Sequence, residues 1–430
     1  VGALTNWKQV SGSMAVKTNG TLWGWGYNVY GQIGNGVATN GYSSPIQVGA
    51  LTTWSSVSSS GSTTLAIKTD GTLWAWGYNY DGNFGNGLSG TGAGRQSPVQ
   101  VGANTNWRQV QVSSYTTVAT RTDGTLWAWG KNDYGQIGNG TSTLYNSPIQ
   151  VGSATNWVQV AVGSYNSYAV DNSKNIYSSG RNQFGQLGGL TPFNFYYSSP
   201  VQVGALTNWK QVSCGYRHTA AVKTDGTLWT CGWNAYGQLG ISNTINYSSP
   251  VQVGSLTNWS QVSCGLYYTA AIKTDGTLWT CGYNSYGVLG NSTTSTMYSS
   301  PIQVGSLTNW SQVSAGYYSW VASKTDYSIW GDGYNLGSSP VLIGGGNLWV
   351  STTVGPNIGS LNPPGSTFSI RAPANVGVST DLADVMVPKE MFKQSSLLAC
   401  GYNRYGQLGI GSAAINTSYN VPQQVTGPNT

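Results

Sequence analysis

Short runs of apolar and β-branched residues recur along the chain and are separated by turn-forming residues. In residues 209–253 the runs lie around Trp209–Cys214, Thr219–Lys223, Thr227–Gly232 and Pro250–Val253. Thr, Val, Tyr and Trp, which strands favour, are abundant, whereas Glu390 is the only Glu in the sequence. The pattern predicts four short strands, named A, B, C and D here, in an all-β protein.

This four-strand unit is repeated in tandem. Residues 198–240 and 248–290 are identical at 34 of 43 aligned positions. A Trp that opens strand A marks eight copies. These residues are Trp7, Trp54, Trp107, Trp157, Trp209, Trp259, Trp310 and Trp349.

The repeat predicts a single β-propeller, because four antiparallel strands per copy form a blade and blades close into a ring. We expect about eight four-stranded blades over residues 1–430, with the eighth closing on the first; the alternative is seven blades plus an irregular C-terminal segment. A Pro-rich insertion, residues 356–390, falls in the last A–B loop. The predicted copies are 1–49, 50–102, 103–152, 153–204, 205–254, 255–305, 306–344 and 345–430.

The motifs of one copy resemble a known family. Val212–Gly215, His218–Ala221, Asp225–Trp229, Cys231–Asn234 and Tyr236–Gly240 carry, in order, the string that is typical of the regulator of chromosome condensation repeat. The resemblance covers nearly the whole chain and implies a propeller. Members of this family usually have seven blades, and the family includes a β-lactamase inhibitor protein, so the resemblance also implies protein binding.

Charge and cysteine content exclude several classes of protein. Only 7% of residues are charged, and the net charge of +6 is not gathered in any basic run, so nucleic acid is not an expected partner. The five Cys show no zinc-site spacing and are too few for a disulfide scaffold. No apolar stretch is long enough to span a membrane, so membrane insertion is not expected.

The polar residues do not form a catalytic pattern. Asp70, Asp123, Asp225, Asp275 and Asp326 each follow a strand-A Trp by sixteen residues, which places them in B–C turns. His218 is the only His and fills a position of the repeat that other copies fill with Thr, Asn, Tyr or Ser. We therefore expect no enzyme, no cofactor and no metal site.

The candidate binding surface lies on one side of the ring. In an antiparallel blade the A–B turns and C–D loops share a side, and these segments vary between copies and are rich in aromatic residues, whereas the B–C turns are uniform. An alternative is that these rings only cap the blades. The candidate residues are Tyr115, Tyr165, Tyr216, Arg217, His218, Trp233, Tyr267, Tyr268, Tyr317, Tyr318 and Trp320.

These patterns favour a non-enzymatic binding or structural propeller, such as a virion protein of a phage or a secreted surface recognition protein. Its expected partner is a protein or a cell-surface glycan, its expected location is extracellular or on a virion, and assembly into a larger particle is left open. The alternatives are a secreted protein inhibitor and a glycan-binding lectin. Guanine-nucleotide exchange, the namesake activity of the family, is not expected, because its basic tail and acidic loops have no counterpart here.

Overall fold

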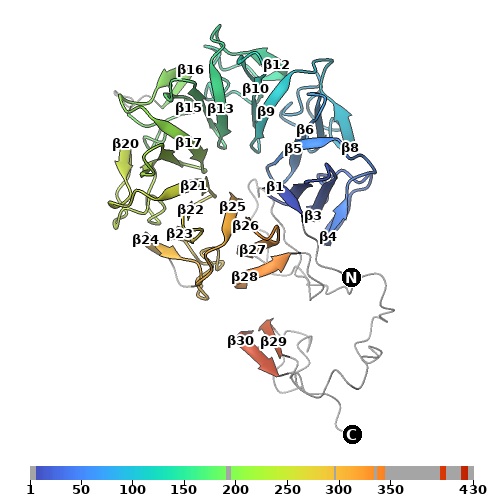
Figure 1. Ribbon diagram of the computed structural model, residues 1–430. Helices are drawn as coiled ribbons and strands as arrows, with labels where there is room; N and C mark the ends of the chain where they lie inside the picture. The colour runs from blue at the N-terminus through green and yellow to red at the C-terminus, as the bar shows by residue number, and fades with distance from the viewer. Residues whose placement is uncertain are drawn as a thin grey trace. The chain divides into compact units, whose positions relative to one another are not determined.

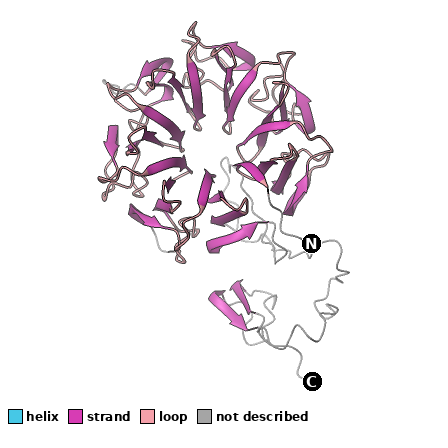
Figure 2. Ribbon diagram, in the orientation of Figure 1, coloured by secondary structure: helices cyan, strands magenta, loops and turns pink. Residues whose placement is uncertain are grey.

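The computed structural model describes residues 6–189, 195–294, 297–333, 337–343, 398–402 and 418–424. These residues form strands and turns without a helix (Figure 2). The chain divides into two compact units, residues 1–371 and 372–430. The first unit contains seven four-stranded antiparallel sheets in a ring, with strand A innermost and strand D outermost (Figure 1). We number these sheets blades 1 to 7 in chain order.

Strands A and B form the inner half of each blade. The A strands are β1 (Trp7–Ser11), β5 (Trp54–Ser59), β9 (Trp107–Val112), β13 (Trp157–Val162), β17 (Trp209–Cys214), β21 (Trp259–Cys264) and β25 (Trp310–Ala315). The B strands are β2 (Met14–Lys17), β6 (Thr63–Lys68), β10 (Thr116–Arg121), β14 (Asn166–Asp171), β18 (His218–Lys223), β22 (Tyr268–Lys273) and β26 (Ser319–Lys324).

Strands C and D form the outer half. The C strands are β3 (Leu22–Asn28), β7 (Leu73–Gly77), β11 (Leu126–Gly130), β15 (Ile176–Arg181), β19 (Leu228–Gly232), β23 (Leu278–Tyr283) and β27 (Ile329–Gly333). The D strands are β4 (Thr39–Gln47), β8 (Arg95–Gln100), β12 (Tyr145–Gln150), β16 (Tyr196–Gln202), β20 (Tyr247–Gln252), β24 (Met297–Gln303) and β28 (Gly337–Ile343). In the second unit, β29 (Leu398–Tyr402) pairs with β30 (Ser418–Gln424).

The Thr-Asp-Gly turn that joins strands B and C is built by its own side chains. In blade 5 the Asp225 carboxylate accepts hydrogen bonds from the backbone N–H (2.9 Å) and the hydroxyl (2.6 Å) of Thr227. Gly226 has a φ of +78°, and a Cβ there would lie 2.0 Å from the carbonyl oxygen of Thr257. Glycine is favoured in this turn because the position needs a left-handed backbone close to a neighbouring carbonyl, although Lys174 and Tyr327 adopt the same positive φ in blades 4 and 7.

The hydrophobic core lies between blades, where the strand-A tryptophans fill the wedge. Trp259 of blade 6 is 2% exposed and packs against the B and C strands of blade 5. The same cluster includes Val253, which follows strand D of blade 5, and Val262 of its own blade, where the edge of the Trp279 ring also lies at 6.3 Å between centroids. Each boundary therefore depends on residues from two adjacent copies.

Hydrogen bonds between neighbouring A strands join the blades at the centre of the ring. The amide oxygen of Gln9 accepts from the backbone N–H of Val57 at 3.0 Å, and the Ser263 hydroxyl accepts from that of Ala315 at 2.9 Å. The same Gln or Ser positions bond neighbouring A strands at the boundaries of blades 2 and 3, 3 and 4, and 5 and 6. Between blades 4 and 5 the Ser position holds Ala161 and the side-chain oxygen of Gln159 has no hydrogen-bond partner.

The ring closes with seven blades, so the prediction of eight blades is wrong and the seven-blade alternative is confirmed. Blade 7 bonds directly to blade 1: Gly12 N donates to the Ser314 hydroxyl (3.1 Å), and the Gln312 amide donates to the Lys8 carbonyl (3.2 Å). A common core also crosses this boundary. It contains Trp7, Val10, Ala15 and Trp25 of blade 1 with Val321, Ile329 and Ile343 of blade 7.

Blades 7 and 1 contact each other directly, so no free surface remains between them against which an eighth blade of this ring could pack. In the region predicted as copy eight, the described residues are β29 and β30, which match strands C and D. The strand-A match at residues 349–355 and the insertion at residues 356–390 lie outside the described residues.

One strand-C position between the blades changes from copy to copy. Trp76 and Trp129 donate from their indole nitrogens to a carbonyl of the preceding blade, at 2.9 Å in each case. Cys231 and Cys281 occupy the same position, are buried and are free thiols, so they pack between the blades where the early copies have Trp. In blade 7 the position holds Asp332, which is fully buried.

The buried carboxyl of Asp332 is expected to lower the stability of the folded protein. Burial raises the pKa of its carboxyl well above the usual range, and Oδ2 has no hydrogen-bond partner. We expect Asp332→Cys, the residue present in blades 5 and 6, to stabilise the protein by about 1–2 kcal/mol at pH 7.

The sign of the pH dependence follows from the raised pKa. Because the folded protein holds this proton more tightly, the Asp332 contribution is most favourable below the unfolded pKa and is lost as the pH rises. The difference in the free energy of unfolding between Asp332→Cys and the parent, measured by urea unfolding, should therefore grow from pH 4 to pH 7. A difference that is constant over this range would contradict the assignment.

Candidate functional site

The described A–B turns and C–D loops place most of the predicted binding residues on one side of the ring. Aromatic rings from five consecutive blades touch one another there, and we call the chain of rings from Tyr115 to Tyr318 the aromatic arc. Tyr115 is buried, and the other rings of the arc are partly or well exposed. Its rings belong to Tyr115, Tyr134, Tyr165, Phe184, Tyr216, Trp233, Tyr236, Tyr267, Tyr283, Tyr286 and Tyr318.

The arc is continuous from blade 3 to blade 7. Tyr115 stacks on Tyr165 with 5.3 Å between ring centroids, and Tyr165 is followed at 6.0 Å by Tyr216. Tyr216 lies 6.0 Å from Tyr267, which contacts Tyr283 at 6.3 Å. Because most rings meet edge to face, each one limits the rotation of its neighbours, and the surface is preorganised.

Cationic side chains lie over the rings of the arc. The Arg217 guanidinium is 4.8 Å from the Tyr216 ring and 4.9 Å from the Phe184 ring. Arg181 lies 5.1 Å from the Tyr134 ring, and Lys131 lies 5.3 Å from the Tyr115 ring. Tyr, Trp and Arg are the residue types that contribute most to protein interfaces.

Tyr317 crosses the centre of the ring below this surface. Its hydroxyl lies 2.9 Å from the Ser114 hydroxyl, so this hydrogen bond joins blade 7 to blade 3, which are not neighbours in the ring. Its carbonyl accepts a bond of 3.3 Å from the backbone N–H of Leu266. Burial raises the pKa of Tyr317, so it stays neutral and acts mainly as a structural residue of the centre.

Burial also keeps other phenols of the arc neutral. It raises the pKa of Tyr115, Tyr267 and Tyr318 above the ordinary value. These hydroxyls therefore stay protonated over the whole physiological range and can donate as well as accept hydrogen bonds. The arc presents neutral aromatic edges beside three fixed cations.

Besides Tyr115 in its A–B turn, three predicted binding residues are buried in strand B, which corrects their placement on the surface. His218 and Trp320 are 0% exposed and Tyr268 is 1% exposed. They are the first or second residues of strand B, the part of the blade that is covered by both neighbouring blades. Their position next to the A–B turn suggested a loop, but strand B already begins at His218 and Tyr268, and one residue before Trp320.

Each of these buried residues connects two blades. The His218 Nε2 atom lies 3.0 Å from the Thr269 hydroxyl, and the Tyr268 hydroxyl donates to the Ser319 carbonyl at 2.8 Å. Trp320 donates to the Val288 carbonyl at 3.0 Å, as the strand-C tryptophans do in the early blades. Trp320 thus fills the space that Trp76 and Trp129 fill from strand C.

Sequence reasoning missed the Tyr that opens the Tyr-Gly-Gln segment of blades 3 and 5 and the Tyr-Gly-Val segment of blade 6. Tyr236 lies 5.4 Å from Tyr267 and 4.9 Å from Tyr283, so it is central to the arc. Tyr134 and Tyr286 occupy the same position in blades 3 and 6. These residues resembled fixed parts of the repeat, yet their position in a C–D loop was a signal that they share a side with the A–B turns.

The described residues contain no group of three or more His, Cys, Asp or Glu side chains arranged to hold a metal ion. The turn carboxylates act as predicted, since Asp70, Asp123, Asp275 and Asp326 each accept the same two bonds as Asp225. Burial lowers the pKa of His218 to about 3, so the only imidazole is neutral at physiological pH.

In the part of the chain that the structure describes, no helix is long and apolar enough to cross a membrane.

The described residues thus form a seven-bladed propeller that carries the aromatic arc on its A–B turns and C–D loops. The family sequence profile of the Regulator of chromosome condensation (RCC1) repeat matches residues 19–67, 123–170, 175–222, 225–272, 275–322 and 394–430. The chain belongs to this family.

Among curated proteins, the chain is similar to the Ultraviolet-B receptor UVR8 of Arabidopsis thaliana, with 28% identity over 246 residues, 54% of this chain and 42% of the relative. It is also similar to the Probable E3 ubiquitin-protein ligase HERC6 of Homo sapiens, with 33% identity over 29% of this chain and 13% of the relative. The matches thus span less than half the length of these relatives.

Solved structures share the fold. The structure of Prp20p from Saccharomyces cerevisiae has a TM-score of 0.68 at 18% identity, covering 79% of this chain and 90% of that one. Yeast RCC1 (Prp20) bound to Kap60 has a TM-score of 0.66 at 19% identity, covering 74% and 82%. At these identities the likeness concerns the fold alone.

Proposed function

We propose that this chain is a non-catalytic recognition propeller that binds a protein partner on the aromatic arc. The observation that carries the proposal is the unbroken series of rings from the buried Tyr115 to the partly exposed Tyr318, with Arg181, Arg217 and Lys131 over them. Large rings held in place by their neighbours supply contact area at a low cost in conformational entropy.

Membership of the family supports a binding or regulatory role. The solved relatives include Prp20 in complex with Kap60 and Prp20p studied for its binding to Gsp1p and histones. We carry over from these relatives only the general use of the propeller as a protein-binding scaffold.

The packing of the arc favours a protein over a glycan. A sugar ring stacks on an open aromatic face, whereas most rings of the arc meet neighbouring rings edge to face. A protein surface with acidic and apolar side chains fits the edges of these rings and the nearby guanidinium groups.

We also propose that the protein acts outside a cell, on a virion or as a secreted protein. The support is compositional: only 7% of residues are charged, and small polar residues and Gly dominate the loops. Localisation of the tagged full chain, in particles, culture medium or cells, tests this part separately.

Photo-crosslinking tests the binding surface. A photoreactive phenylalanine analogue at position 267, within the arc, should form a crosslink to a protein in material from the source. The matched control is the same replacement at Tyr327, which is 50% exposed in a B–C turn on the other side. Equal crosslinking from both positions, or crosslinks from position 327 alone, would exclude the arc as the binding surface.

Once the partner is isolated, Tyr267→Ala combined with Tyr283→Ala should weaken its binding at least about tenfold. The reason is that both rings lie in the middle of the arc and contact each other and Tyr236. Calorimetric titration measures the effect, with Tyr327→Ala as the control. Unchanged affinity would mean that the rings only cap the blades, and a glycan-array signal lost in the double variant would identify a lectin instead.

A further inference from the structure

Six of the seven blades place one of their own cations between two aromatic rings at the start of strand A. In blade 6, Lys273 Nζ lies 5.0 Å from the centroid of Trp259 and 3.7 Å from that of Trp279. In blade 3, the Arg121 guanidinium lies 4.6 Å from Trp107 and 3.6 Å from Trp127. The cations are Lys17, Lys68, Arg121, Lys223, Lys273 and Lys324.

Blade 4 keeps the rings but reverses the charge. Trp157 and Tyr177 lie 5.2 Å apart at 86°, the same edge-to-face arrangement as in the other blades. The residue paired with Trp157 in the sheet is Asp171, whereas Lys273 is paired with Trp259 in blade 6. Blade 4 thus has an aromatic pair and a carboxylate where every other blade has an aromatic pair and a cation.

The Asp171 carboxylate is 4% exposed and takes part in no ion pair among the described residues. Its oxygens accept bonds from Asn175, from the backbone N–H at 2.8 Å and from the side-chain amide at 3.0 Å. These bonds orient the carboxylate but do not neutralise it. Lys174, in the same turn, is exposed and makes no described contact with these rings.

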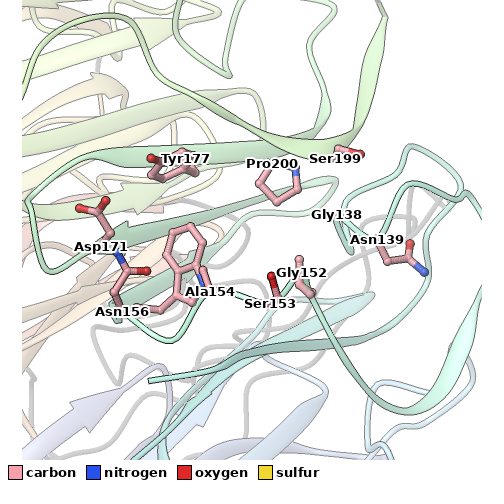
Figure 3. Close-up of a pocket in the computed structure, with 12 residues that line it drawn as sticks. Gly138, Asn139, Gly152, Ser153, Ala154, Asn156, Asp171, Tyr177, Ser199 and Pro200 are labelled. Atoms are coloured by element: carbon pink, nitrogen blue, oxygen red, sulfur yellow. The ribbon is translucent and has the colours of Figure 1, made fainter. Parts of the chain in front are cut away.

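A cavity of about 550 Å³ opens beside this carboxylate (Figure 3). Asp171, Asn156 and Tyr177 lie at one end of it, and Asn139 and Ser199 lie at the other. The corresponding cavity of blade 6, which contains Lys273 in its wall, measures about 390 Å³.

Trp157 lines the blade 4 cavity and is slightly less covered than its counterparts. It is 7% exposed, whereas the corresponding Trp in the other six blades is 1–3% exposed. The cavity is therefore the same structural unit without the internal cation.

We propose that this cavity binds the side chain of a Lys or Arg supplied by a partner protein. The six other blades show which group the aromatic pair accommodates, a primary ammonium or a guanidinium on an alkyl chain. A cation there gains both the attraction of the rings and that of a carboxylate with little solvent around it. The site lies at the B–C end of blade 4, away from the aromatic arc, so the proposal is independent of the proposed function.

Calorimetric or NMR titration of the full chain with Nα-acetyl-lysine N-methylamide tests the site. We expect saturable binding of one equivalent, and at least about tenfold weaker binding by the Nε-acetylated analogue, which has no charge. Asp171→Lys should abolish binding, because it restores the internal cation that six blades already tolerate. Binding that survives in Asp171→Lys, or equal binding of the neutral analogue, would overturn the proposal.

Two further variants separate the site from effects of general charge. Lys174→Gly, the turn residue of other blades, should bind as well as the parent, because Lys174 does not occupy the cavity. Lys273→Asp should create a second equivalent of binding in blade 6. A loss of binding in Lys174→Gly, or the absence of a second equivalent in a folded Lys273→Asp variant, would contradict the structural argument.

The source of the cation is tested by comparing n-butylammonium with the peptide Gly-Gly-Lys-Gly-Gly. A protein side chain is the occupant if Gly-Gly-Lys-Gly-Gly binds at least as well as n-butylammonium. If n-butylammonium binds and the peptide is excluded, the site accepts only small free cations and the assignment to a protein partner is wrong.

Discussion

Trp259→Ala is expected to lower the free energy of unfolding by about 3–5 kcal/mol. Trp259 is 2% exposed and fills the boundary between blades 5 and 6, where it packs against Val222, Leu228 and Val262. The substitution leaves a cavity that the strands of two blades cannot close, because hydrogen bonds to their neighbours hold them apart. It also removes one of the two rings around Lys273.

Urea unfolding followed by circular dichroism measures this loss. Tyr327→Ala is the control, since this ring is half exposed in a B–C turn and its removal should change the stability by no more than about 0.5 kcal/mol. A loss of less than about 1 kcal/mol for Trp259→Ala would show that the tryptophans do not hold adjacent blades together.

Acidification from pH 7 to pH 4.5 is expected to remove about 3 kcal/mol of stability through His218 alone. Burial lowers the pKa of this imidazole to about 3 in the folded protein, against 6.5 for an exposed His. Its protonation therefore favours the unfolded chain. The contribution of His218 is complete above pH 6.5 and is lost progressively as the pH falls towards 3.

The His218→Asn variant isolates the effect of protonating the imidazole, because Asn166 occupies the same buried position in blade 4 and does not titrate. The Asp residues of the B–C turns also lose stabilising interactions in acid, but they do so equally in both proteins. The difference in unfolding free energy between parent and variant should thus change by about 3 kcal/mol between pH 7 and pH 4.5. Parallel pH profiles would show that the imidazole is hydrated in the folded state.

Much of the candidate site could be predicted from the loops of the repeat. The variable A–B turns identified Tyr165, Tyr216 and Tyr267, which lie in the arc. His218, Tyr268 and Trp320 were misplaced, because the sequence does not show where a turn ends and a doubly covered strand begins. The reversed charge at Asp171 was visible in the alignment of copies, but its meaning required the cation–aromatic contacts of the other blades.

The sequence by itself determined the blade. Apolar runs, Thr-Asp-Gly turns and the strand-A Trp are local features, so each copy specifies the same four antiparallel strands wherever it occurs. The tertiary structure alone decided how many blades close the ring and which residues are covered. Closure depends on whether blade 7 meets blade 1, as the bond from Gly12 to Ser314 shows, and that contact joins residues 302 positions apart. Similar copies carry similar boundary surfaces, so the number of copies does not fix the number of blades, whereas the geometry of the wedge between blades does.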